Sequence, residues 1–130
     1  MFKTDLVEAQ INDGKRLVAA LDKTGLQIRT AFWFFDTEGE QWKLVLHFPV
    51  VDERFQNISY GIVHTVMLRL RPGVSFELTD VLLQGSKSIL LGAINELVRT
   101  GPWDLADIRI PRTAAGDVLI EEAYVYRSAA

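Results

Sequence analysis

Two aromatic segments, which together predict a β-hairpin, constrain this fold more than any other part of the sequence. Residues 28–35 have the sequence IRTAFWFF, residues 41–48 have the sequence QWKLVLHF, and DTEGE connects them. Aromatic and β-branched residues favour strands, and a short polar connection that contains glycine is typical of a hairpin. The pattern therefore predicts a well-packed sheet, and it contains no catalytic motif.

The register of this hairpin depends on the length of its loop. We expect a three-residue loop that ends with Gly39 in the left-handed conformation. Phe34 then lies opposite Trp42. Two residues further along the strand, Phe32 lies opposite Leu44, so that one face of the hairpin is solidly apolar.

The other face of the hairpin carries Trp33 and Phe35 between polar side chains such as Lys43. This face is too apolar for an ordinary solvated surface, so we expect it to be covered. A helix of the same chain is one candidate cover. A protein partner or a second copy of the chain is the other, because aromatic residues are enriched in interface cores. Trp33 and Phe35 are therefore the predicted interaction residues.

Residues 5–23 are predicted to form the first helix, because apolar or small residues recur there every three or four positions. The expected buried stripe consists of Val7, Ile11, Gly14, Val18 and Leu21. Thr4 is the expected N-cap, and Gly25 is the expected stop. Glycine within the stripe indicates either close approach of a neighbouring element or simple tolerance.

Two further helices are predicted, one from Asp52 to about residue 70 and one from Ser86 to about residue 100. The expected buried positions are Phe55, Ile58, Ile62 and Val66 in the former, and Leu90, Ile94 and Leu97 in the latter. Residues 65–71 also alternate like a strand, so helix and strand both stay open for this segment.

Three more strands are predicted, at 76–83, 105–110 and 118–127, the last two joined by a turn at Gly116. The order of elements is α-β-β-α-β-α-β-β. This order predicts an α+β fold with an antiparallel or mixed five-stranded sheet packed by about three helices.

Composition limits the remaining classes of protein. At 130 residues the chain has the usual size of one domain, so we expect a single domain over 1–130. The net charge of −3 disfavours nonspecific binding to nucleic acid. There is no cysteine, no signal peptide pattern and no apolar run of membrane-spanning length, so we expect a cytoplasmic protein without a membrane partner.

The candidate chemistry is sparse. The two histidines, His47 and His64, lack the short spacing of metal ligands, and we expect no metal and no cofactor. Ser86, Lys87 and Ser88 resemble a phosphate site at a helix start, although the full P-loop pattern is missing. Simple N-capping is the favoured explanation of these three residues, and the alternative is an incidental anion site.

Arginines near the C-terminus are the other candidate ligands. Arg109 and Glu121 are expected to pair across the last hairpin as surface ions. Alternatively, Arg112 and Arg127 converge beside tyrosines and form a face that contacts an anion or RNA.

The leading hypothesis is a non-enzymatic interaction or accessory domain that binds itself or another protein through its apolar sheet surface. The first alternative is an enzyme that handles a small molecule or nucleotide, with an anion site at residues 85–88. The second alternative is a weak RNA-binding module that uses the C-terminal hairpin.

Overall fold

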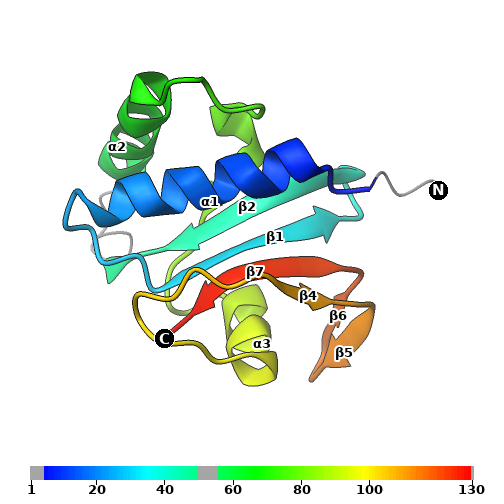
Figure 1. Cartoon of the computed structure of the whole chain (residues 1–130). Coiled ribbons are helices and arrows are strands. Elements are labelled where there is room, and N and C mark those ends of the chain that lie inside the picture. Colours follow the sequence, from blue (N-terminus) through cyan, green and yellow to red (C-terminus); the bar gives the residue numbers. More distant parts are fainter. Residues whose placement is uncertain (1–4, 50–55, 130) are drawn as a thin grey trace.

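The computed structural model describes residues 5–49 and 56–129 (Figure 1). Its α-helices are Glu8–Asp22 (α1), Gln56–Arg69 (α2) and Ile89–Leu97 (α3), and Leu78–Asp80 forms a 3-10 turn (η2). The strands are Thr30–Asp36 (β1), Gln41–His47 (β2), Val81–Leu83 (β3), Ile108–Ile110 (β4), Thr113–Ala115 (β5), Val118–Ile120 (β6) and Ala123–Ser128 (β7).

Five of the strands form one mixed sheet in the order β3-β2-β1-β7-β4. The β2–β3 pair is parallel, whereas the other pairs are antiparallel. The predicted α+β class with a mixed five-stranded sheet and three helices is therefore confirmed. β5 and β6 form a separate hairpin across Gly116, whose φ of +60° confirms the predicted turn. The predicted strand 118–127 is in fact two strands, β6 and β7.

Elements cover both faces of the sheet (Figure 1). α1 and α2 pack on one face, where the core includes Trp33, Leu44 and Tyr126. α3 and the β5–β6 hairpin pack on the other face, where the core includes Phe32 and Val45. Because both faces of β1 and β2 are buried, their sequences are nearly continuous apolar runs rather than alternating ones.

The predicted register of the aromatic hairpin is wrong by one residue. Phe35, not Phe34, pairs with Trp42, and Trp33, not Phe32, pairs with Leu44. The loop has four residues rather than three, and Glu40 adopts the left-handed conformation predicted for glycine, with φ of +52°. Since side chains alternate along a strand, this single extra residue changes which aromatic residues share a face.

The first two helices differ from their predicted stripes. In α1 the predicted stripe is buried from Ile11 onward, but Val7 is half-exposed at the N-cap position, and Thr4 lies outside the described residues. α2 continues to Arg69, so the ambiguous segment 65–71 is mainly helical.

The buried face of α2 lies one residue further along the chain than predicted. It consists of Ser59, Val63 and Met67, whereas Ile58 is exposed and Ile62 and Val66 are only partly buried. The predicted cap Asp52 and the predicted core residue Phe55 lie outside the described residues.

α3 and β3 are shorter than predicted. The N-cap of α3 is Ser88 rather than Ser86, and its Oγ accepts a hydrogen bond from the Leu91 backbone N–H at 3.3 Å. Ile94 is buried as predicted, and Leu91 takes the place predicted for Leu90. The predicted strand 76–83 begins only at residue 81, because the preceding residues form η2.

Gly14 allows α1 to approach the sheet closely. A Cβ atom at Gly14 would lie 2.5 Å from the Tyr126 hydroxyl oxygen and 2.7 Å from Nε1 of Trp33. The Trp33 indole N–H donates to the Tyr126 hydroxyl at 2.9 Å, and that hydroxyl donates to the Ile11 carbonyl at 2.5 Å. Close approach, rather than tolerance, therefore explains this glycine.

Arg127 ties the C-terminal end of α1 to β7. Its side chain is fully buried and bonds both carboxylate oxygens of Asp22, at 2.8 and 2.9 Å. It also donates to the carbonyls of Ile28 and Asp104. A register shift in the β1–β7 pairing lies beside Arg127, and the consecutive residues Tyr126 and Arg127 both reach α1.

Candidate functional site

Trp33 and Phe35, the predicted interaction residues, are core residues. Both are buried, and Trp33 makes an edge-to-face contact with Phe76 at 5.2 Å between ring centroids. The cover expected over this face of the hairpin is provided by the chain itself. A surface for a partner must therefore be built from other side chains.

The predicted anion ligands do not converge. Ser88 caps α3 through its hydroxyl, and Ser86 and Lys87 are exposed in the turn before it. Arg112 pairs with Glu121 at 3.4 Å, whereas Arg127 is buried against α1. In the antiparallel β4–β7 pair, residue 112 follows the end of β4 beside the start of β7, while residue 127 lies near its far end. The predicted convergence of the two arginines is therefore wrong.

The predicted Arg109–Glu121 pair is replaced by other contacts. Arg109 is paired with Tyr124 in the sheet, and its guanidinium carbon lies 5.0 Å from the centroid of the Tyr124 ring. Glu121 pairs with Arg112 instead.

Two tyrosines of β7 have strongly shifted pKa values. Burial, together with a 2.6 Å hydrogen bond to Asp107, raises the pKa of Tyr124 to about 12. Burial also raises the pKa of Tyr126. Hydrogen bonds from Lys15 and Tyr124 hold the pKa of Asp107 below its ordinary value. Both tyrosines are therefore protonated hydrogen-bond donors at neutral pH, which suits their role in joining β7 to its neighbours.

The outer face of α2 is the most unusual surface among the described residues. Residues 56–68 contain no Asp, Glu, Lys or Arg, although charged residues make up 24% of the chain. Ile58 is 59% exposed and Leu68 is 61% exposed. Gly61 and Thr65 are exposed between them. Other exposed residues of α2, among them Asn57, His64 and Thr65, are polar but uncharged, and the helix is buried on one side only.

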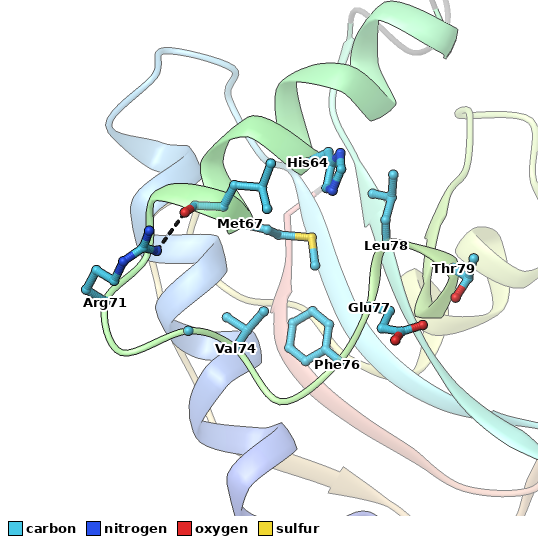
Figure 2. Close-up of a pocket in the computed structure, with 10 residues that line it drawn as sticks. His64, Met67, Arg71, Val74, Phe76, Glu77, Leu78 and Thr79 are labelled. Atoms are coloured by element: carbon cyan, nitrogen blue, oxygen red, sulfur yellow. Dashed lines mark hydrogen bonds between the residues drawn. The ribbon is translucent and has the colours of Figure 1, made fainter.

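A groove of about 550 Å³ lies beside the C-terminal half of α2 (Figure 2). Its apolar lining consists of Met67, Leu68, Val74, Phe76 and Leu78. In Figure 2 the Met67 thioether projects toward Phe76 and Leu78. His64 lies on the same helix as Met67, at the upper side of the groove in this view. The groove and the exposed side of α2 share Leu68, and together they form what we call the α2 surface.

Hydrogen bonds hold the loop that forms one wall of the groove. Arg71 donates to the carbonyl of Leu68 at 2.7 Å (Figure 2). It also donates to the carbonyl of Leu70 at 2.8 Å, and the two bonds satisfy the C-terminal end of α2. The Ser75 backbone N–H donates to the Asp13 carboxylate of α1 at 2.8 Å. The groove is therefore fixed both to α2 and to α1.

The pKa of Asp13 reflects this attachment. Partial burial alone raises the pKa of a carboxyl group, but hydrogen bonds from Ser75 and Arg16 outweigh burial and hold the pKa of Asp13 below its ordinary value. Arg16 also donates to the Pro72 carbonyl at 2.5 Å, so the same pair of side chains holds the loop at two points.

Sequence reasoning missed the α2 surface, although its signal was present. Apolar residues outside one buried stripe, together with the absence of charged residues, favour a second contact for a predicted helix. The predicted stripe of Ile58, Ile62 and Val66 follows the outer and flanking positions of α2 instead of its buried centre.

Comparisons with known proteins give no family assignment. No protein-family model matches the chain, and neither the curated proteins nor the solved structures contain a significant match. Among the described helices, none combines the length and apolar character needed to cross a membrane. Within residues 5–49 and 56–129, no three His, Cys, Asp or Glu side chains are grouped as metal ligands would be.

Proposed function

We propose that this chain is a non-enzymatic interaction domain that associates with a second copy of itself through the α2 surface. The observation that carries the proposal is the pair of exposed anchors, Ile58 and Leu68, on a helix whose first 13 residues are uncharged. Exposed apolar residues that are contiguous with a groove are typical of protein interaction sites.

Charge favours a second copy as the occupant. A two-fold interface brings the same patch of both chains together, so any charged group near the axis would meet its own copy. The chain has a net charge of −3, yet the α2 surface from residue 56 to residue 68 lacks carboxylates and basic groups. The helix part of this surface is therefore suited to pairing with itself, whereas Arg71 and Glu77 line the groove beside it.

The spacing of the anchors fits an antiparallel pair of α2 helices. Ile58 and Leu68 are ten residues apart, which is about 15 Å along a helix. Antiparallel pairing about a two-fold axis would set Ile58 of each chain beside Leu68 of the other, at the mouth of the groove. Gly61 would lie near the crossing, where nothing lies within 4 Å of the position of an added Cβ and the helices can approach closely.

Substitution of the exposed leucine tests this proposal. Leu68→Glu places a carboxylate within the proposed contact, and we expect it to convert a concentration-dependent dimer into a monomer. Leu119→Glu on β6 is the matched control, because Leu119 is 58% exposed and lies away from α2. Sedimentation equilibrium over a range of concentrations gives the mass of each variant.

The two results that would overturn the proposal are distinct. A wild-type chain that stays monomeric at every concentration would exclude self-association. A wild-type dimer that survives Leu68→Glu but dissociates with Leu119→Glu would move the interface to the β5–β6 hairpin. Thermal unfolding of both variants checks that each still folds.

A further inference from the structure

Trp103 is exposed although it lies on a well-fixed turn. The other two tryptophans, at positions 33 and 42, are buried, whereas Trp103 is 63% exposed. The Gly101 backbone N–H donates to the Asp104 carboxylate at 2.7 Å, and Arg127 donates to the Asp104 carbonyl at 2.9 Å. The indole is thus presented to solvent by a turn that is bonded to the core, which is not the usual position of a tryptophan.

A second cavity, of about 220 Å³, lies against this indole. It is lined by Gln27, Ile28, Arg29, Pro102, Trp103 and Ala129. Backbone hydrogen bonds fix its walls, because the Arg29 N–H donates to the His47 carbonyl and the Ala129 N–H donates to the Arg29 carbonyl. The cavity is therefore framed by a strand end and by a bonded turn.

The backbone at Gln27 is strained. Its φ of +57° lies in the left-handed region, which a residue other than glycine occupies at a cost of about 1 kcal/mol or more. Strain of this kind persists where the surrounding structure imposes it, and it is concentrated at ligand sites.

One cation of the cavity has no acidic partner among the described residues. Asp22 is engaged by Arg127 through both oxygens, and the Asp104 carboxylate accepts the Gly101 N–H. Arg29 is exposed, and its side chain has no hydrogen bond or ion pair within residues 5–49 and 56–129. Arg29 and Trp103 therefore line the same cavity, and the Arg127 guanidinium carbon, which lies 6.0 Å from the centroid of the Trp103 ring, leaves the opposite face of the indole for a ligand.

We propose that this cavity binds a small planar monoanion, namely an aromatic carboxylate. The ring would stack on Trp103, and the carboxylate would accept paired hydrogen bonds from the Arg29 guanidinium, whose geometry matches two oxygens. The cavity is smaller than the roughly 300–1,000 Å³ of sites for drug-sized ligands, so a single ring fits best. A single arginine balances a single negative charge, which favours a carboxylate over a phosphate.

Three probes separate the contribution of the planar ring from that of the negative charge. Titration of the chain with benzoate should shift the Trp103 indole N–H signal in proton–nitrogen correlation spectra, with saturation, and Trp103→Phe identifies the signal. Benzamide keeps the ring but lacks the charge, and cyclohexanecarboxylate keeps the charge but lacks the planar ring. We expect each to bind at least tenfold more weakly than benzoate, and equal binding by either would overturn the proposal.

A matched pair of arginine variants locates the anion contact. Arg29→Gln should weaken benzoate binding at least tenfold, whereas Arg112→Gln, at an exposed arginine outside this cavity, should leave it unchanged. An unchanged affinity in Arg29→Gln would overturn the assignment. Tighter binding of uridine 5′-monophosphate than of benzoate would assign the cavity to nucleotides and would overturn the proposal of an aromatic carboxylate. Leu68→Glu should bind benzoate like the wild type, so this test is independent of the α2 surface.

Discussion

The two helices that share one face of the sheet, α1 and α2, differ in how completely the chain uses them. α1 buries one stripe and carries charged residues outside it, among them the exposed Glu8 and the partly exposed Lys15. α2 also buries one stripe, but its outer side carries Ile58 and Leu68 and no charge before Arg69. The apolar surface of α1 is therefore satisfied within the chain, whereas the apolar surface of α2 exceeds what the chain covers.

The difference also extends to the attachments of the two helices. α1 reaches the sheet through Gly14 and is bonded to β7 at Asp22, so its position is set by polar contacts inside the core. α2 joins the sheet edge through the Tyr60 hydroxyl, which accepts the Leu83 backbone N–H at 3.0 Å. An element that is fixed to the core on one side and exposes large apolar side chains on the other is suited to association.

The largest effect is expected from the ion pair that holds the end of α1. Arg127→Met removes the partner of Asp22 and leaves two carbonyls without a donor, so we expect the free energy of unfolding to fall by about 3 kcal/mol. Urea unfolding measures the change. Arg112→Met is the control, because its exposed pair with Glu121 should contribute less than about 1 kcal/mol. Equal losses in both variants would contradict the assigned difference between the two arginines.

A smaller loss is expected at the close contact between α1 and the sheet. Gly14→Ala gains helix propensity, but its methyl group would overlap the Tyr126 hydroxyl and the Trp33 indole, so we expect a net loss of about 1 to 2 kcal/mol. Gly92→Ala in α3 has open space around the added methyl and should gain up to about 1 kcal/mol. If both alanine variants were stabilised in urea unfolding, the close approach of α1 would be refuted.

The smallest effect concerns the loop that links α1 to the groove of α2, and it depends on pH. Since the folded pKa of Asp13 lies below the ordinary 3.8, its contribution is complete above that value and is lost as the pH falls through the folded pKa. The wild type should therefore lose stability below about pH 4, and Asp13→Asn should lose less. We expect the two losses to differ by less than about 1 kcal/mol. Urea unfolding at pH 7 and pH 3 checks this result, with Asp107→Asn as a second carboxyl of lowered pKa. An Asp13→Asn variant that loses as much stability as the wild type on acidification would contradict the role of Asp13.

The fold class was predictable from the sequence, because apolar periodicity and turn residues determine which elements form. The register of the aromatic hairpin was not, since both faces of β1 are apolar and only the four-residue loop with Glu40 decides the pairing. The buried side of α2 was hidden because Ile58 and Leu68 lie outside its buried stripe and no charged residue from 56 to 68 marks the exposed side.

The roles of single polar residues were also beyond sequence reasoning. Arg127 belongs to a residue type that is usually exposed, and only the register shift beside it and the end of α1 place it in the core. The cavity at Trp103 combines residues 27–29 with residues 102, 103 and 129, so no local sequence motif indicates it.

Charge pairing across the α2 surface tests self-association most directly. Thr65 is exposed on this surface between the two anchors, so antiparallel pairing would bring its two copies within about a Debye length, 10 Å at moderate salt. We expect Thr65→Glu and Thr65→Lys each to be monomeric in sedimentation equilibrium at concentrations where the wild type is dimeric, and their equimolar mixture to form heterodimers. If both variants dimerise alone as well as the wild type does, α2 is not the contact between the copies.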